Sequence, residues 1–267
     1  GGIDLAGTLV EEQKTSFSPQ QELLVTGCDI GEKHNGGYSQ YVRVKEESIV
    51  PLPKGLSLKE AMILGTAGFT AALALYRLKS LGLKKDQGPV VITGASGGVG
   101  SFALNMLANQ GFETIGVTTK EHSHNYLYNL GASKVHTPQE LSLGRKVLES
   151  ARYGAVIDNV GGELLQNLIP HVKLWGSVAC IGNAAGANLQ TTVLPLILRG
   201  VSLLGISSNN CPSPLRKKLW ADLATNLKPK DLSQFVHQET PLDKALEYFD
   251  QVLERKVTGR ILIRCKE

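Results

Sequence analysis

A β-branched run that ends in a glycine-rich turn constrains the fold more than any other part of the chain. The run is Val90–Thr93, and the turn GASGGVG over residues 94–100 leads into a segment of helical character. A helix that begins at such a turn presents unpaired N–H groups and the positive end of its dipole to an anion. Gly94 permits the tight turn, Gly97 lets backbone approach a pyrophosphate, and Gly100 lets the helix pack closely on the sheet. The pattern predicts a dinucleotide site, with a purely structural turn as the alternative.

Strands and helices alternate after Pro89. Strands are expected at Val90–Thr93, Thr114–Thr118, Lys134–His136, Ala155–Asn159, Ser177–Ile181 and Ser202–Ile206. Gly111 and Gly131 stand where helices between these strands would end. The alternation predicts an α/β fold with a doubly wound parallel sheet covered by helices on both faces.

The two ends of the chain have a different pattern. Before residue 57, strands are expected at Leu23–Thr26, Tyr41–Val44 and Ile49–Leu52. After residue 209, helices are expected at Pro214–Asn226 and Leu242–Arg255, and strands at Phe235–Gln238 and Arg260–Arg264. A capping box at Ser57–Glu60 begins a helix that extends to about residue 79, with an interruption at residues 65–68. The last strand could pair with the opening β-rich region. We expect a dinucleotide-binding domain at 58–208 and a β-rich domain built from 1–57 and 209–267.

Composition disfavours several classes of protein. The formal charge of +4 comes with no basic cluster interleaved with aromatic residues, so nucleic-acid binding is not expected. We expect no membrane span, because no apolar run looks long enough to cross a bilayer, and we find no secretory leader. The four cysteines lie far apart, without zinc-ligand spacing or a disulfide framework. Reduced thiols and a cytoplasmic location are the expectation.

The glycine turn also fits the TGxxxGxG pattern of short-chain dehydrogenases. Those enzymes need a Tyr-x-x-x-Lys pair, in which the lysine lowers the pKa of the tyrosine for proton transfer. Of the seven tyrosines, only Tyr41 has a lysine four positions on, Lys45. This pair precedes the turn, whereas that family places it well after, so a short-chain dehydrogenase is disfavoured.

Several other segments occur in a specific order along the chain. They are GIDLAG (2–7), GGYSQY (36–41), LGTAGFTA (64–71), the glycine turn, YLYNLGA (126–132) and TVLPLILRGV (192–201). In this order they resemble the zinc-independent quinone-oxidoreductase family of medium-chain dehydrogenases/reductases, in the branch that contains the acrylyl-CoA reductases. The resemblance implies a Rossmann domain, a GroES-like catalytic domain, and a homodimer formed at the sheet edge Val201–Ile206. It also implies an N-terminally truncated chain, since family members begin with a further β-rich segment carrying Asn-Tyr-Lys-Asp.

The resemblance bears on metal chemistry. Zinc members of the superfamily carry a His-Glu pair in the GIDLAG segment, where this chain has Ile3 and Asp4 and no neighbouring cysteine or histidine. Without a Lewis acid, alcohol oxidation loses its means of stabilising an alkoxide. Reduction of an activated C=C bond remains accessible, because the substrate's carbonyl takes up the developing charge and hydrogen-bond donors can hold the enolate. No metal is therefore expected, and enones, quinones or enoyl thioesters such as acrylyl-CoA are the expected substrates.

The end of the second predicted strand bears on the choice of cofactor. An NAD enzyme usually has Asp or Glu there to bind the ribose hydroxyls, whereas this chain has Thr118, Thr119 and Lys120. Two hydroxyls and an ammonium suit a 2′-phosphate, so NADPH is the expected cofactor. Thr119 stands where glycine is common in the family. The alternative is an exposed loop lysine that binds no ligand.

Further candidate cofactor residues lie before the turn, within it and after it along the chain. They are Thr66, Thr70, Ser96, Gly97, Gly98, Val99, Asn159, Gly182, Asn183 and Ile206. The resemblance places Thr66 and Thr70 in a helix that faces the nicotinamide, although helix threonines often bond their own backbone. Asn159 and Asn183 follow strands of a parallel sheet, where ligands bind. For Asn183, an Asx-type turn is the alternative.

Candidate catalytic residues are fewer. Tyr38 in the GGY motif is the candidate proton donor or substrate-positioning group, and His34 could also donate. A half-buried structural tyrosine and a solvated loop histidine are the alternatives. Arg199 and Arg216 could meet a phosphate-bearing substrate or form salt bridges. The sequence predicts an NADPH-dependent C=C reductase, with a quinone reductase or an NADPH-binding chain made inactive by truncation as alternatives.

Overall fold

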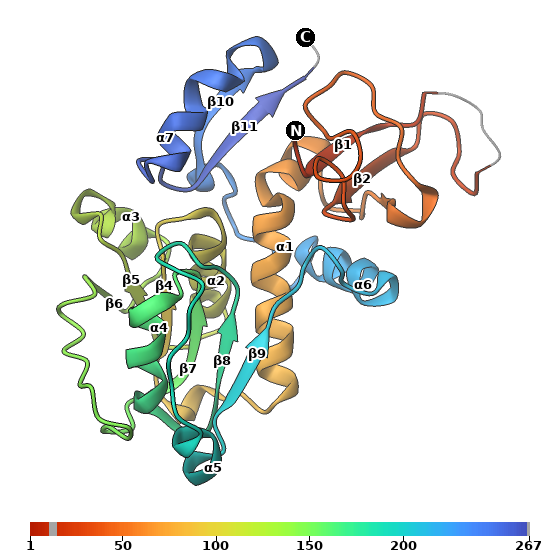
Figure 1. Cartoon of the computed structure of the whole chain (residues 1–267). Coiled ribbons are helices and arrows are strands. Elements are labelled where there is room, and N and C mark those ends of the chain that lie inside the picture. Colours follow the sequence, from red (N-terminus) through yellow and green to blue (C-terminus); the bar gives the residue numbers. More distant parts are fainter. Residues whose placement is uncertain (11–14, 266–267) are drawn as a thin grey trace. The chain divides into compact units, whose positions relative to one another are not determined.

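The computed structural model describes residues 1–10 and 15–265. The chain forms two compact units, one of Thr70–Ile206 and one of Gly1–Phe69 together with Ser207–Glu267 (Figure 1). We call Thr70–Ile206 the sheet unit. We call Gly1–Phe69 together with Ser207–Glu267 the β-rich unit.

The sheet unit is built on six parallel strands in the order β6-β5-β4-β7-β8-β9. The strands are β4 (Val90–Thr93), β5 (Thr114–Val117), β6 (Lys134–His136), β7 (Tyr153–Asp158), β8 (Val172–Cys180) and β9 (Ser202–Gly205). The helices are α2 (Gly98–Asn109), α3 (His124–Asn129), α4 (Gly162–Leu168) and α5 (Leu194–Arg199). The predicted doubly wound parallel sheet is confirmed.

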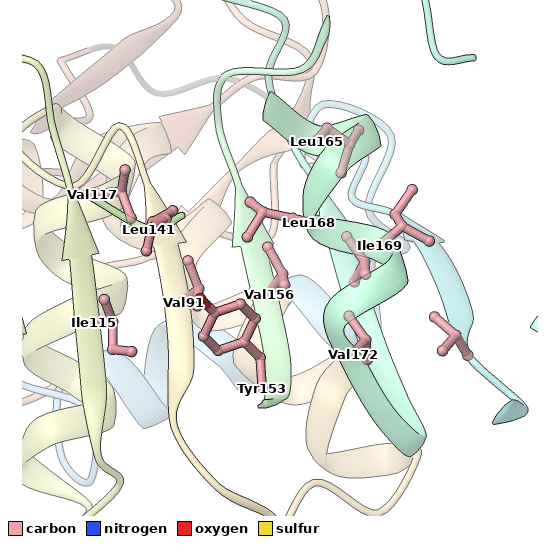
Figure 2. Close-up of a cluster of buried hydrophobic side chains, with 12 residues drawn as sticks. Val91, Ile115, Val117, Leu141, Tyr153, Val156, Leu165, Leu168, Ile169 and Val172 are labelled. Atoms are coloured by element: carbon pink, nitrogen blue, oxygen red, sulfur yellow. The ribbon is translucent and has the colours of Figure 1, made fainter. Parts of the chain in front are cut away.

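Alternate residues of β5 show that helices cover both faces of the sheet. Ile115 and Val117 belong to a core cluster with Leu165 and Leu168 of α4 on one face (Figure 2). A Cβ on Gly116 would lie 3.1 Å from the Leu104 side chain of α2, on the opposite face. Successive strand side chains point to opposite faces, so both faces of β5 must be buried, and its four residues are apolar or small.

The β-rich unit contains two small sheets. Strands β1 (Asp4–Thr8), β2 (Glu22–Thr26) and β3 (Val50–Pro51) form an antiparallel sheet in that order, and β10 (Val236–Pro241) pairs in parallel with β11 (Arg260–Arg264). Helices α6 (Ser213–Leu223) and α7 (Phe249–Leu253) belong to the same unit. The expectation that the last strand pairs with the opening region is wrong, since β11 pairs with β10.

Other boundaries in this unit also differ from expectation. Residues 41–44 form no strand, although Val42 and Val44 are half-buried and alternate with exposed neighbours. The alternating apolar side chains of this segment are explained by packing, because Val44 lies against the hydrophobic cluster of Leu23 and Ile49 although the segment pairs with no strand of the described residues. β1 was not expected, and the helix expected at 242–255 is a 3-10 helix at 242–248 followed by the short α7.

Helix α1 (Leu58–Ser80) passes from one unit into the other along the chain. Its capping box is present, with Ser57 N–H donating to Glu60 Oε2 at 2.9 Å and Glu60 N–H to Ser57 Oγ at 3.2 Å. The expected interruption is also present, because Gly65 has φ 49° and ψ −156°. By length and composition α1 is apolar enough to cross a membrane, contrary to the expectation that no such run exists, but 78% of that window is buried inside the protein. A core helix meets the same criteria.

Candidate functional site

The glycine turn between β4 and α2 is closed by its own backbone. Gly94 has φ 58°, and its carbonyl accepts the N–H of Gly97 at 3.0 Å. A Cβ on Gly100 would lie 2.4 Å from the Gly94 carbonyl oxygen, so only glycine lets the first turn of α2 lie this close to the turn. The N-cap residue Gly97 offers no side-chain cap.

The start of α2 therefore suits an anion. The N–H groups of Gly98, Val99 and Gly100 lie in the first turn, which has no intrahelical acceptor for them. The first turn also carries no acidic residue that would repel an anion. Backbone donors and the dipole of a twelve-residue helix together fit a pyrophosphate.

The end of β5 is fixed to this turn by hydroxyl groups. Thr118 is 4% exposed, and its Oγ1 lies 2.9 Å from Ser96 Oγ and accepts the N–H of Lys120 at 3.2 Å. The Thr118 hydroxyl thus joins the two loops rather than facing solvent. Thr119 is exposed and Lys120 half-buried. Burial lowers the pKa of the Lys120 ammonium, so an anion beside it would relieve an unfavourable desolvation.

The ends of β4 and β7 share a buried polar network. The Thr93 hydroxyl donates to Asp158 Oδ1 at 2.6 Å, and Gly161 N–H donates to Asp158 Oδ2 at 2.8 Å. Burial raises the pKa of Asp158, with these hydrogen bonds opposing the effect. Asn159 donates through its backbone N–H and its Nδ2 to the hydroxyl and carbonyl of Thr93, at 2.9 and 2.8 Å. Asp158 and Thr93 are not among the residues predicted for the site. The signal that could have indicated Asp158 is an acidic residue at the end of an apolar strand.

The end of β8 lies beside Asn159. A Cβ on Gly182 would lie 2.5 Å from the Asn159 carbonyl oxygen, so glycine is required there. Asn183 is exposed, and its carbonyl accepts the N–H of Gly186 in a local turn. Ile206 is 8% exposed, and Thr70 is 3% exposed. The sheet unit thus brings the residues expected at Ser96–Val99, Thr118–Lys120, Asn159 and Gly182 to the carboxyl ends of neighbouring strands.

A second polar cluster lies in the β-rich unit. The Asp4 carboxylate accepts the backbone N–H of Thr66 at 3.0 and 2.9 Å and also accepts its hydroxyl, while Arg260 Nη2 lies 3.4 Å from Asp4 Oδ2. Asp4 therefore caps the part of α1 that begins after Gly65. A Cβ on Gly65 would lie 2.5 Å from Asp4 Oδ2. Thr66 is a predicted cofactor residue, whereas Asp4 and Arg260, which pair across 256 positions of sequence, are not among the residues predicted for a site.

Tyr38 lies within electrostatic reach of this cluster. Burial raises the pKa of its phenol, the charge of Arg260 opposes that change, and the charges of Asp4 and Cys265 add to it. The side chain is 41% exposed, and its ring centroid lies 6.0 Å from that of Phe249. A raised pKa keeps the phenol protonated at neutral pH, as a donor must be.

His34 has different surroundings from Tyr38. Its side chain is exposed, and its backbone closes a turn, donating to the Asp29 carbonyl at 3.2 Å and accepting the N–H of Gly31 at 2.9 Å. The pKa of the Asp29 carboxyl is lowered mainly by its hydrogen bond with the Asn209 side chain, then by Lys33, and His34 adds only a smaller effect.

The two arginines considered for a phosphate-bearing substrate bind backbone carbonyls instead. Arg216 is 3% exposed and donates to the carbonyls of Thr26, Ser208 and Asn209 at 2.6, 2.8 and 3.0 Å. Arg199 donates to the carbonyls of Glu149, Pro170 and Val172. Among the described residues, neither arginine forms the salt bridge that was the alternative. Within residues 1–10 and 15–265, no group of three or more His, Cys, Asp or Glu side chains is placed to hold a metal ion.

Comparison with known sequences identifies the family. Residues 98–225 match a family model described as zinc-binding dehydrogenase. The putative quinone oxidoreductase YhfP of Bacillus subtilis is 39% identical over 264 residues, which cover 98% of this chain and 80% of that protein. The acrylyl-CoA reductase AcuI of Ruegeria pomeroyi is 40% identical over 263 residues, covering 98% of this chain and 79% of that protein.

Solved structures agree with the sequence comparison. Escherichia coli YhdH with bound NADPH has a TM-score of 0.95 and 37% identity, covering 99% of this chain and 81% of that chain. Bacillus subtilis YhfP with NAD bound also has a TM-score of 0.95, at 39% identity, covering 98% of this chain and 80% of that chain. Sequence identities of 37% and 39% show common membership of a family and not only a shared fold. The predicted family is therefore confirmed. The chain belongs to the zinc-independent quinone-oxidoreductase family of medium-chain dehydrogenases/reductases, which includes the acrylyl-CoA reductases.

Proposed function

We propose that this chain is an NADPH-dependent reductase of the C=C bond in α,β-unsaturated carbonyl compounds or enoyl thioesters of the acrylyl-CoA kind. Membership of the family makes it an oxidoreductase. Its relatives YhdH from Escherichia coli and from Salmonella enterica were crystallised with NADPH and NADP. The substrate class is supported by 40% identity to a protein named acrylyl-CoA reductase.

One observation carries the choice of NADPH over NADH. The loop after β5 presents exposed Thr119 and the half-buried ammonium of Lys120, held in place by Thr118 and Ser96. A carboxylate at this strand end would favour the diol of NADH, whereas a hydroxyl and an ammonium favour a 2′-phosphate. Asp158 holds the neighbouring loop, and Gly97–Gly100 would receive the pyrophosphate.

The proposed roles divide between the two units. The region 58–208 is the proposed dinucleotide-binding domain, and 1–57 with 209–267 the proposed catalytic domain. When bound, NADPH supplies the hydride for the β-carbon of the substrate. Tyr38 holds a proton on its phenol at neutral pH and can give it to the α-carbon or donate to the enolate oxygen. Arg260, fixed by Asp4 and by the Ile63 carbonyl, adds a positive charge near that oxygen donor.

Quinone reduction is the second candidate. It uses the same cofactor site, and it is supported by 39% identity to a protein named putative quinone oxidoreductase. A quinone carbonyl would accept the same donors as an enone carbonyl. A chain that binds NADPH without turnover is the third candidate.

The first experiment is calorimetric titration of the chain with NADPH and with NADH. We expect NADPH to bind at least tenfold more tightly, because Lys120 forms a charge-assisted hydrogen bond only with the phosphate. Absence of binding by both nucleotides would contradict the proposed function.

The second experiment measures NADPH oxidation with acrylyl-CoA, with methyl vinyl ketone and with 1,4-benzoquinone. Turnover of the thioester or the enone supports the leading proposal. Turnover of the quinone alone selects the second candidate. Tight NADPH binding with none of the three turned over selects the third.

We further propose that two copies of the chain associate through an apolar patch beside β9. The patch consists of Leu174, Trp175, Leu194, Ile197 and Leu198, which are between 41% and 75% exposed. β9 is the edge strand of the sheet, so its outer N–H and C=O groups face no strand of the same unit (Figure 1). Exposed apolar side chains beside an open sheet edge are typical of a protein interface.

A further inference from the structure

The side-chain oxygen of Asn159 is buried, and no hydrogen-bond donor reaches it in the described part of the protein. The amide nitrogen donates to the Thr93 carbonyl at 2.8 Å, and the backbone N–H donates to the Thr93 hydroxyl at 2.9 Å. A flipped amide would set its oxygen against the Thr93 carbonyl oxygen, so the first bond fixes the orientation. Asn159 Oδ1 therefore points away from the Thr93 carbonyl and still lacks a donor.

The surroundings of Asn159 explain why no protein group fills this role. Gly94 and Gly182 lie on either side, and a Cβ would approach the Asn159 Cβ to 3.4 Å at Gly94 and the Asn159 carbonyl oxygen to 2.5 Å at Gly182. Neither neighbour has a side chain to donate. A buried acceptor without a partner is rare and costs stability, because it has lost its hydrogen bonds to water. A hydroxyl or amide of a bound molecule would supply the missing donor.

The strand order indicates which part of the cofactor lies here. Lys120 follows β5, the glycine turn follows β4, and Asn159 follows β7, in the spatial order β5-β4-β7-β8. With the 2′-phosphate at β5 and the pyrophosphate at the glycine turn, the nicotinamide half extends across the ends of β7 and β8. Within the nicotinamide half, the hydrogen-bond donors nearest to the pyrophosphate are the hydroxyls of the ribose.

We propose that Asn159 Oδ1 accepts a hydrogen bond from a hydroxyl of the nicotinamide ribose. The assignment rests on the proposed function, since it requires that the sheet unit bind NADPH. Through this bond Asn159 is a positioning residue, which holds the nicotinamide half against the ends of β7 and β8. Thr93 in turn holds the Asn159 amide in the accepting orientation.

Calorimetry of Asn159→Ala with three ligands tests the assignment. The ligands are NADPH, 2′-phospho-ADP-ribose, which lacks only the nicotinamide, and 2′-phospho-ADP, which lacks the nicotinamide ribose as well. We expect the first two to bind about 5- to 10-fold more weakly and the third to be unaffected, since one hydrogen bond to the ribose is lost. Asn109→Ala is the matched control, because the side chain of this exposed asparagine of α2 donates to Asn105 and not to the turn, and all three affinities should stay the same.

Asn159→Ala removes both the acceptor Oδ1 and the hydrogen bond from Nδ2 to the Thr93 carbonyl, and a second variant separates these two effects. Asn159→Asp keeps an oxygen of the same size and adds a charge that affects all three ligands through the shared pyrophosphate. The ratio of the affinities for 2′-phospho-ADP-ribose and 2′-phospho-ADP should therefore stay near that of the wild type, while Asn159→Ala lowers it.

Three results would overturn the assignment. If only NADPH binds Asn159→Ala more weakly, the partner of Asn159 is the nicotinamide carboxamide. If all three ligands bind equally more weakly, Asn159 only supports the turn. If no ligand binds more weakly, Asn159 forms no hydrogen bond with the cofactor. Failure of the proposed function has a different signature, because then the wild-type chain itself binds none of the three ligands.

Discussion

Lys120 is the residue on which the cofactor preference depends. Its ammonium is half-buried after β5, and burial lowers its pKa, so binding of a phosphate compensates for lost hydration. Lys120→Ala should weaken NADPH about 10- to 100-fold, the range expected for one charge-assisted hydrogen bond, and leave NADH nearly unchanged. Titration calorimetry measures both affinities. Lys217→Ala, at an exposed lysine of α6, is the control, and an equal loss for both nucleotides would refute the preference.

His171 gives a prediction about pH. The ring is 3% exposed, with Nδ1 3.0 Å from the Ser150 carbonyl oxygen and Nε2 3.3 Å from the Gly144 N–H. A neutral ring donates at Nδ1 and accepts at Nε2, so a second proton would break the bond to Gly144. Burial lowers the pKa of His171, with the charges of Arg152 and Arg199 acting in the same direction. The hydrogen bond to the Ser150 carbonyl and the charge of Glu149 oppose this effect.

The sign of the pH effect follows from that lowered pKa. Below the ordinary histidine pKa of about 6.5 the unfolded chain takes up a proton that the folded protein resists, so the free energy of unfolding falls as the pH falls. Melting temperatures measured from pH 7.5 to 5 should decline, and His171→Gln should decline less over the same interval. Parallel declines for both proteins would contradict this origin.

At the scale of elements, α1 depends on its interruption at Gly65. The residue has φ 49°, and a Cβ would lie 2.5 Å from the Asp4 carboxylate that caps the continuing helix. Gly65→Ala should lower the free energy of unfolding by at least about 2 kcal/mol, because a left-handed backbone is strained for alanine and the Asp4 cap must move. Denaturant unfolding measures the loss. Gly7→Ala is the control, since a Cβ there meets nothing within 4 Å.

Local sequence signals predicted some elements well and others poorly. The capping box of α1, the interruption at Gly65 and the buried strands β4 and β7 all follow from nearby residues. The segment 41–44 has the alternation of a strand, but a strand needs a partner, and its apolar side chains are half-buried without one. In the same way, β11 pairs with β10 because tertiary structure brings them together, which alternation within either strand does not specify.

At the scale of the whole molecule, the apolar patch beside β9 predicts a dimer. Ile197 is 70% exposed on α5, and Trp175 is 75% exposed on β8. Ile197→Asp should shift the chain from dimer to monomer in light scattering, because a charge would be buried without a partner in the interface. Leu81→Asp, at an apolar residue 49% exposed at the end of α1, should leave the mass unchanged. A monomeric wild-type chain would remove the proposal.

The sequence alone determined the doubly wound sheet and the position of the glycine turn. Strand periodicity, glycines and capping residues act over a few positions, so they can be recognised without knowing the fold. The order of segments also predicted the family, and with it the oxidoreductase class. Ser96, Thr118 and Lys120 remain predicted cofactor residues, and they follow β4 and β5, whose ends lie at one edge of the sheet.

Which polar groups satisfy one another became evident from the folded chain and not from the sequence. Asp4 caps α1 at Thr66 and pairs with Arg260, and Thr93 holds both Asp158 and Asn159, although these residues are separated by 62, 256, 65 and 66 positions. Arg216, a candidate phosphate ligand in the sequence, is buried on three carbonyls instead. A hydrogen bond depends on distances of about 3 Å and on orientation, which the sequence does not encode locally and the folded chain alone establishes.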